Sequence, residues 1–369
     1  MKMKKALALF LTCVLCLSAL GGCGGSGAPA SSTGGAAAST PAAEGASEGA
    51  APAGTDASKL KIGIVTTNKI STQPFLLGIK AGFEKAQAEY GFEGKIIESN
   101  DVNEVEENVR SLVDDGFDLV IGGEYGAVDA INKLALEYPE RTFAMFDATS
   151  EVENVRNIDF HEQEAAYLIG MLAGMVSETG KLGAVHVGQN QKSYNWRWGF
   201  AEGAEYGASK VGKTIDKSTI QWAFVGSYND PAKAKDFALN MFNSGCDFIN
   251  GACALGETGI IEASTEKGFY TSTQDVDKTE QGENIITGQI KNTDEVFYQL
   301  VADYCQGNWS NETIYYGLKE KGVGMLYVTK EGAAPRRADV FTDEMVNILK
   351  QTAQEIIDGK IDMTVPLEK

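Results

Sequence analysis

The stretch Phe117-Asp118-Leu119-Val120-Ile121-Gly122-Gly123 decides the fold class of this chain. Its apolar residues follow one another almost without alternation, and two glycines end the run. A strand buried on both faces has this pattern, whereas a strand with one solvated face alternates apolar and polar residues. The stretch therefore predicts a central strand of a parallel sheet that helices cover on both sides.

Strand-like and helix-like segments alternate on both sides of this stretch. We expect strands at 60–65, 95–98 and 142–146 and helices at 74–90, 105–114 and 127–138. The alternation then resumes, with strands at 181–187, 221–225, 247–250, 270–274 and 285–290 and helices at 162–177, 196–211, 231–243 and 259–267. This order predicts an α/β protein with two doubly wound lobes. The late helices at 295–304 and 343–357 indicate that the chain crosses between the lobes more than once, which makes a hinge and a cleft.

The first 58 residues have a different composition from the rest of the chain. Three early lysines and an apolar run precede Leu20-Gly21-Gly22-Cys23, which predicts a signal peptide over residues 1–22. The run resembles the bacterial lipobox, which implies that Cys23 is lipidated and carries palmitate; an ordinary signal peptide with an incidental cysteine is the alternative. Residues 23–58 would then be a flexible Gly/Ala/Ser/Pro tether on the extracytoplasmic face of a bacterial cell membrane.

Charge and composition exclude several functions. The 369 residues contain 32 Lys plus Arg and 51 Asp plus Glu, for a net charge of −19. Phosphate backbones repel such a protein, so we expect no nucleic-acid partner. With two histidines in the chain we expect no metal site and no cofactor. Cys246, Cys253 and Cys305 are expected to be small buried residues.

Candidate ligand-binding residues stand where the predicted strands end. Ligands of open parallel sheets bind beyond the carboxyl ends of the strands, where this chain carries carboxylates, amides, a lysine and aromatic rings. Asp275 beside Lys291 suits the hydroxyl groups of a sugar. Tyr194, Trp196 or Trp198 would stack on a planar ring. This mixture favours a neutral, planar, hydroxylated ligand.

The chain also resembles the basic membrane protein family of lipoproteins, which are substrate-binding components of ABC importers. The resemblance covers residues 61–325 and rests on the runs at 117–122, 142–147, 159–170, 226–233, 289–292 and 317–324. It implies a type I periplasmic-binding-protein fold with three crossings between the lobes. Lobe 1 would comprise 59–158 plus 292–322, and lobe 2 would comprise 159–291 plus 323–369.

The best-understood members of this family are purine nucleoside receptors, and the resemblance implies roles for several residues. Asp147 would face the ligand from the end of a lobe 1 strand, and Phe160 would lie at the first crossing. Asp275 and Lys291 would hold the ribose hydroxyls. The segment around Trp196 and Arg197 would form a wall over the base.

The first loop departs from the family pattern. At 69–73 the chain lacks the Phe and Asn that nucleoside receptors carry there, although Gln73 remains as a candidate ligand-binding residue. The glycine-rich segment is altered too, to Ala254-Leu255-Gly256-Glu257-Thr258-Gly259. The ribose side of the pattern is therefore kept better than the base side.

The resemblance implies a monomeric protein that binds a purine nucleoside and delivers it to a permease with separate ATPase subunits. Riboflavin, another nucleobase or a sugar-like ligand is the alternative, and a ligand-sensing surface lipoprotein is a further one. An enzyme is the rival class, because Asp147, Glu257 and Asp275 could meet across a cleft as glycosidase carboxylates. The chain has none of the common hydrolase or nucleotide-binding motifs, so we expect a binding protein. Plainer interpretations also stand: Asp147 could cap a turn, Asp275 and Lys291 could form a solvated pair, and the aromatic residues could pack a helix start.

Overall fold

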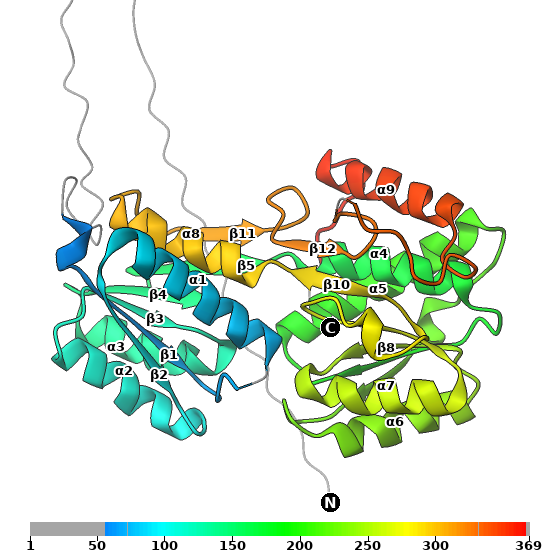
Figure 1. Ribbon diagram of the computed structural model, residues 1–369, viewed down its shortest axis with the longest axis horizontal. Coiled ribbons are helices and arrows are strands. Elements are labelled where there is room, and N and C mark those ends of the chain that lie inside the picture. The colour runs from blue at the N-terminus through cyan, green and yellow to red at the C-terminus, as the bar shows by residue number, and fades with distance from the viewer. Residues whose placement is uncertain (1–55, 72, 331, 367–369) are drawn as a thin grey trace, which may run out of the picture. The chain divides into compact units, whose positions relative to one another are not determined.

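The computed structural model describes residues 56–366 except 72 and 331. The predicted signal peptide, Cys23 and almost all of the tether lie outside the described residues. No helix within the described part of the chain is long and apolar enough to cross a membrane. The rest forms two α/β lobes (Figure 1).

Lobe 1 is built on a six-stranded sheet of order β11-β5-β4-β3-β1-β2. All neighbours in this sheet are parallel. Its strands are β1 (Lys61–Thr66), β2 (Glu93–Glu98), β3 (Leu119–Gly122), β4 (Thr142–Phe146), β5 (Val155–Phe160) and β11 (Thr313–Tyr316). Strands β3 and β4 are buried along their whole length, as their unbroken apolar runs predict.

Helices cover both faces of this sheet. They are α1 (Pro74–Tyr90), α2 (Val105–Asp114), α3 (Val128–Glu137) and α8 (Thr293–Cys305). Helices α1 and α8 pack on one face, and α2 and α3 on the other (Figure 1). Pro74 at the first turn and the left-handed Gly91 after the last turn set the ends of α1.

Lobe 2 repeats the arrangement with sheet order β12-β10-β9-β8-β6-β7. Its strands are β6 (Leu182–His186), β7 (Gln221–Phe224), β8 (Phe248–Ala252), β9 (Tyr270–Thr273), β10 (Ile285–Lys291) and β12 (Val323–Met325). Strand β12 runs antiparallel to β10, and the other pairs are parallel. The short strands β11 and β12 and strand β5 were not predicted.

The helices of lobe 2 are α4 (Glu162–Val176), α5 (Gln191–Lys210), α6 (Pro231–Asn243), α7 (Glu257–Lys267) and α9 (Asp343–Ile357). Helices α4 and α5 cover one face of the sheet, and α6 and α7 cover the other. The three remaining cysteines, Cys246, Cys253 and Cys305, are free and buried, which confirms the prediction for them.

Glycines bring α4 and α5 into backbone contact. A Cβ atom on Gly170 of α4 would lie 2.1 Å from the Phe200 carbonyl oxygen, and one on Gly203 of α5 would lie 2.0 Å from the Tyr167 carbonyl oxygen. Only glycine allows such an approach. The packing fixes the rotation of α5, whose first turns carry several residues of the site described below.

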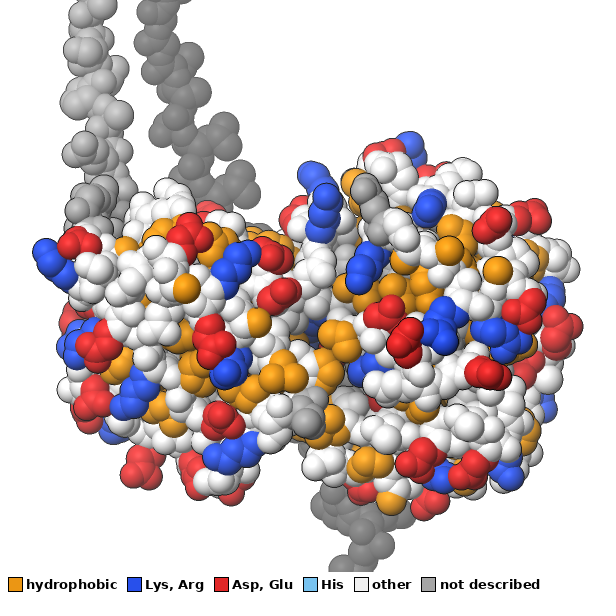
Figure 2. All heavy atoms as spheres, in the orientation of Figure 1, with side chains coloured by type: hydrophobic (Ala, Val, Ile, Leu, Met, Phe, Trp, Pro, Cys, Tyr) orange, Lys and Arg blue, Asp and Glu red, His pale blue; other side chains and the backbone are white. Residues whose placement is uncertain are grey.

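The chain crosses between the lobes three times: after Phe160, after Lys291 and after Tyr316. The first crossing follows residue 160 rather than the predicted boundary at 158, because β5 continues in the lobe 1 sheet to Phe160. Figure 2 shows hydrophobic side chains gathered where the lobes meet, and charged side chains of both signs over the outer surfaces. The carboxyl ends of the parallel strands in both sheets face the space between the lobes, because residues at these ends from both lobes line one cavity.

Candidate functional site

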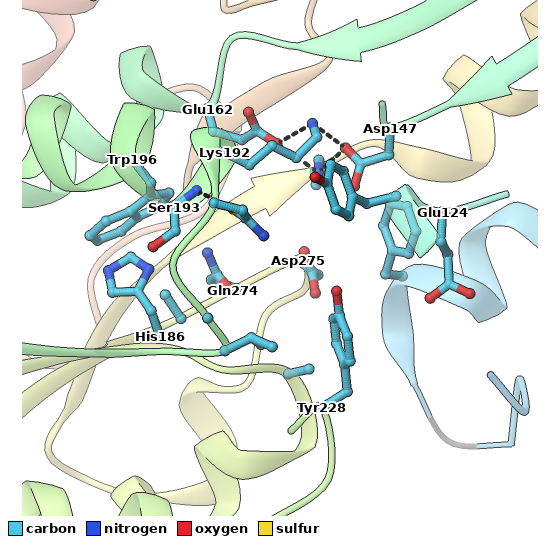
Figure 3. A pocket seen from close by; sticks show the side chains of 18 of the residues that line it. Glu124, Asp147, Glu162, His186, Lys192, Ser193, Trp196, Tyr228, Gln274 and Asp275 are labelled. Atoms are coloured by element: carbon cyan, nitrogen blue, oxygen red, sulfur yellow. Dashed lines mark hydrogen bonds and ion pairs between the residues drawn. The ribbon is translucent and has the colours of Figure 1, made fainter. Parts of the chain in front are cut away.

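A cavity of about 170 Å³ lies between the lobes at the carboxyl ends of the strands (Figure 3). Both lobes contribute to its walls. Residues of lobe 1 that line it are Gln73, Phe75, Glu124, Tyr125 and Asp147, and residues of lobe 2 and the crossings include Glu162, His186, Lys192, Ser193, Trp196, Tyr228, Gln274, Asp275, Gln289 and Lys291. A cleft with apolar, aromatic and convergent polar groups is the usual form of a small-molecule site.

Three non-glycine residues of the cavity wall have left-handed backbones. Asp147 follows β4 with φ 61°, Asp275 follows β9 with φ 72°, and Ala254 follows β8 with φ 53°. Aspartate tolerates this region better than most residues, but the conformation still costs energy. These turns aim the two carboxylates into the cavity at the places where the strands end.

Two lysines and three carboxylates form a partly buried network on one side of the cavity. Lys291 Nζ lies 2.6 Å from Asp147 Oδ1 and 3.1 Å from Glu162 Oε1. Lys192 Nζ lies 3.0 Å from Asp147 Oδ1 and 3.1 Å from Glu162 Oε1, and it also bonds Asp159. Figure 3 shows Lys192 and Glu162 beside Asp147. The network joins lobe 1, which supplies Asp147 and Asp159, to lobe 2.

The network keeps its lysines charged. Burial alone would lower the pKa of Lys291, but the nearby Asp147 and Glu162 outweigh it and raise this pKa above its ordinary value. Burial raises the pKa of Asp159, whereas Lys192 and Lys291 outweigh burial at Asp147 and lower the pKa of that carboxyl. The carboxylate oxygens lie within 4.8 Å of one another, a spacing that also suits a metal ion. Here the ammonium groups supply the positive charge between them.

Helix α5 begins five residues earlier than the predicted start at 196, and this changes the site. The Asn190 side chain caps the helix by accepting a hydrogen bond from the Ser193 N–H at 2.8 Å. Residues 192 and 196 are then one helical turn apart, so Lys192 and Trp196 both face the cavity. The asparagine before residue 191 was the signal for this start, and the sequence interpretation missed it.

Trp196 is the member of the aromatic trio that lines the cavity. Its Nε1 donates to Gln289 Oε1 at 2.8 Å, and its ring stacks on Phe200 with centroids 5.3 Å apart. His186 meets the same ring edge-on at 5.0 Å. Protein contacts therefore hold Trp196 on two sides.

Several polar groups of the cavity have no hydrogen-bond partner among the described residues. They include the buried His186 Nε2, Ser193 Oγ and Glu162 Oε2. Burial, helped by Arg197, lowers the pKa of His186 to about 3, so its imidazole is neutral. Burial raises the pKa of Asp275, although Lys278 and Lys291 oppose that shift. Buried polar groups are normally paired, so these atoms are available to a polar ligand.

A family model described as ABC transporter substrate-binding protein PnrA-like matches residues 59–365. The chain belongs to this family. It is a solute-binding protein of an ABC transporter, a binding protein rather than an enzyme. A ligand and a membrane transporter are therefore its partners. The glycosidase alternative is thereby set aside.

Known proteins similar to this PnrA-like chain agree with that assignment. Basic membrane protein A2 of Borrelia garinii subsp. bavariensis is 27% identical over 275 residues, covering 72% of this chain and 79% of the relative. The ABC transporter nucleoside-binding protein BmpA of Lactococcus lactis subsp. cremoris is 27% identical over 281 residues, covering 73% and 77%. A solute-binding protein of an ABC transporter system from Aeropyrum pernix K1 shares the fold, with TM-score 0.74, 21% identity and coverage of 84% and 94%.

The predicted site residues of this PnrA-like protein do not all reach the cavity. Gln73, Asp147, Trp196, Asp275 and Lys291 line it. The other two predicted residues lie behind its wall: the Phe160 ring centroid is 4.5 Å from Lys291 Nζ, and the Arg197 guanidinium lies over the rings of Tyr194, Trp222 and Phe224 at 5.4–5.9 Å.

Lobe 1 supplies two further groups to the cavity near the altered first loop. Phe75, in the first turn of α1, lines the cavity and lies 5.1 Å from Lys291 Nζ. An aromatic side chain thus reaches the cavity although the loop at 69–73 lacks one. Glu124 accepts hydrogen bonds from the Thr67 N–H at 2.7 Å and hydroxyl at 2.8 Å. Burial raises the pKa of Glu124, and the Thr67 hydrogen bonds oppose that shift.

Proposed function

We propose that this solute-binding protein captures a purine nucleoside between its lobes and delivers it to the permease of an ABC importer, whose ATPase subunits supply the energy. The observation that carries the proposal is the pair formed by Asp275 and Lys291. Asp275 follows β9 and Lys291 ends the neighbouring β10, the Lys291 N–H donates to the Asp275 carbonyl at 3.1 Å, and both residues line the cavity. A carboxylate and an ammonium on neighbouring strands suit vicinal ribose hydroxyls.

The charge of the cavity supports a nucleoside rather than a nucleotide. Lys192 and Lys291 are already bound to Asp147 and Glu162, and further carboxylates at Glu124 and Asp275 line the same space. Acidic groups outnumber basic ones, so a phosphate would be repelled. Hydroxyl and N–H donors are favoured instead.

Aromatic rings on both lobes support a planar base. Phe75 of lobe 1 and Trp196 of lobe 2 line the cavity, while the neutral His186 and Ser193 offer unpaired polar atoms near Trp196. Contacts made to both lobes at once are stronger in the closed form, so ligand binding would favour closure. The relative from Lactococcus lactis, named as a nucleoside-binding protein, supports the same ligand class.

Calorimetric titration of the purified protein tests the proposal. We expect inosine, guanosine or adenosine to bind, and inosine monophosphate not to bind. Asp275→Asn should weaken nucleoside binding by about tenfold or more, the loss expected for a charge-assisted hydrogen bond. Asp236→Asn, on the exposed surface of α6, is the matched control and should bind as the wild type does. Binding of riboflavin or of simple sugars without nucleosides would refute the nucleoside assignment.

We also propose that the protein works as a monomer anchored through a lipid on Cys23, on the outer face of the bacterial cell membrane. The support is the lipobox-like sequence before Cys23 and the lipoprotein named among similar chains, from Pyrococcus abyssi. Labelling with radioactive palmitate in cells should mark the wild type. Cys23→Ala should remain unlabelled and appear in the soluble fraction; labelling that persists would refute the anchor.

A further inference from the structure

We infer that Glu257 is a positioning residue that holds Asp275 toward the ligand by clamping both sides of its loop. The inference rests on the proposed function, in which Asp275 receives the ribose hydroxyls. Glu257 stands in the altered glycine-rich segment and begins helix α7. Glu257 does not line the cavity, so it would not contact the ligand directly.

The Glu257 carboxylate bonds the residues that flank Asp275. Its Oε1 accepts the Gln274 N–H at 2.9 Å, and its Oε2 accepts Lys278 Nζ at 2.6 Å. The side chains of Glu257 and Lys278 are only 3% and 11% exposed. A charge-assisted pair shielded from water is a stiff connection. The loop from residue 274 to 278 is thereby held at both ends by one side chain.

The loop needs such a clamp because the backbone of Asp275 is strained. Asp275 has φ 72°, a conformation that costs energy for a residue other than glycine. Two other bonds hold the loop: the Lys291 N–H donates to the Asp275 carbonyl, and Gln274 Nε2 donates to Gln289 Oε1 at 3.3 Å. Without Glu257 the left-handed turn would relax toward ordinary backbone angles, and the carboxylate would leave the cavity wall.

Glu257→Gln tests the clamp, because glutamine keeps the shape but loses the ion pair to Lys278. We expect the affinity for inosine to fall about tenfold, as for one misdirected charge-assisted hydrogen bond. The affinity for 2′,3′-dideoxyinosine, which lacks the hydroxyls, should not change. The substitution should also have no further effect in an Asp275→Asn background. Glu257 would act only on the fold if Glu257→Gln lowered the affinity for both ligands equally. The same conclusion would follow if it lowered the inosine affinity by the same factor in the Asp275→Asn background.

A double variant guards against misfolding. Glu257→Gln leaves the Lys278 ammonium buried without its partner, whereas Glu257→Gln with Lys278→Met removes both charges. We expect the double variant to keep the thermal stability of the wild type and to show the same selective loss for inosine. Full inosine affinity in a folded double variant would overturn the inference.

Hydrogen exchange separates this inference from the proposed function. Amide exchange in residues 274–278 of the ligand-free protein should accelerate in Glu257→Gln, and exchange in helix α6 should not. If the wild type bound no nucleoside, the proposed function would fail while the exchange result still reported on the clamp. Unchanged exchange in the loop would overturn the clamp even if inosine binds.

Discussion

Lys192 Nζ lies 3.0 Å from Asp147 Oδ1, and this ion pair joins the first turn of α5 in lobe 2 to the end of β4 in lobe 1. Asp159 of lobe 1 bonds the same ammonium. These ion pairs therefore hold the two lobes together across the cleft. A ligand in the cleft would add its own contacts with both lobes to these ion pairs.

Lys192→Met should open the ligand-free protein. Removing the ammonium leaves Asp147, Asp159 and Glu162 with Lys291 alone, so repulsion between the lobes grows. Small-angle scattering should show a larger radius of gyration for the variant. The free energy of unfolding should fall by about 3 kcal/mol, the lower end for a broken buried pair, because Lys192 is 21% exposed.

Lys235→Met is the matched control for that experiment. Lys235 also pairs with two acids, Glu262 and Glu266, but within lobe 2 on the outer surface of α6 and α7. The control should scatter as the wild type does. Identical scattering of Lys192→Met and Lys235→Met would contradict the interlobe role of Lys192.

Trp196→Phe should remove the fluorescence response to ligand. Trp196 is a cavity tryptophan, hydrogen-bonded to Gln289. The substitution also leaves Gln289 with one donor fewer, so stability should fall by about 1 kcal/mol. Fluorescence titration with inosine measures the effect.

Trp309→Phe is the control, since Trp309 packs on Tyr304 in lobe 1 and its loss should leave the ligand response intact. A full response in Trp196→Phe would place the ligand elsewhere.

His186 should make the protein sensitive to acid. Its pKa is lowered from 6.5 to about 3, chiefly by burial, so the folded protein holds it neutral while the unfolded chain takes up a proton. Its contribution to stability is present above pH 6.5 and is lost as pH falls toward 3. The wild type should lose about 1.4 kcal/mol per pH unit over this range relative to His186→Gln, as measured by urea unfolding.

His161→Gln supplies a control of opposite sign. The hydrogen bond that His161 Nδ1 donates to Glu164 raises the pKa of His161, so its contribution is present at low pH and is lost as pH rises through the folded pKa. The difference between the wild type and this variant should therefore grow on acidification. Equal acid sensitivity of the wild type and His186→Gln would show that His186 is not held neutral.

Gly203→Ala should weaken the packing of α5 on α4 and lower the stability of the protein. The new Cβ would stand 2.0 Å from the Tyr167 carbonyl oxygen, which belongs to rigid helix backbone. We expect a loss of about 3 kcal/mol from overpacking, measured by thermal unfolding. Gly188→Ala is the control, because nothing lies within 4 Å of its added Cβ and stability should change little. Equal melting temperatures for the two variants would contradict the close packing of α4 on α5.

The sequence was sufficient for those parts of the site that stand at strand ends. Asp147 and Asp275 follow apolar strands, and parallel strands bring their carboxyl ends to one edge of a sheet. Their place at the cavity could therefore be predicted from pattern alone. The left-handed backbones could not, because they depend on distant residues: the Ile158 carbonyl accepts the Asp147 N–H, and Glu257 and Lys291 bond the loop of Asp275.

Lys192, Ser193 and His186 line the cavity but were not predicted as ligand-binding residues. In sequence, Lys192 cannot be told from a solvated lysine after a loop. Its side chain faces the cavity because of the rotation of α5, which the glycine contacts with α4 determine. Arg197 shows the converse error: one residue after Trp196, it turns away from the cavity toward Phe224. A helix rotates about 100° per residue, so neighbours in sequence need not share a face.

Hydrophobic periodicity and the alternation of strands and helices along the chain predict two α/β lobes with a cleft, because both patterns are local. Which charges meet in that cleft depends on the tertiary structure. Lys192 and Asp147 lie 45 residues apart and in different lobes, and they meet only when the crossings bring the lobes together. Electrostatic energy depends on distance in space and on burial, and neither is encoded in a local pattern.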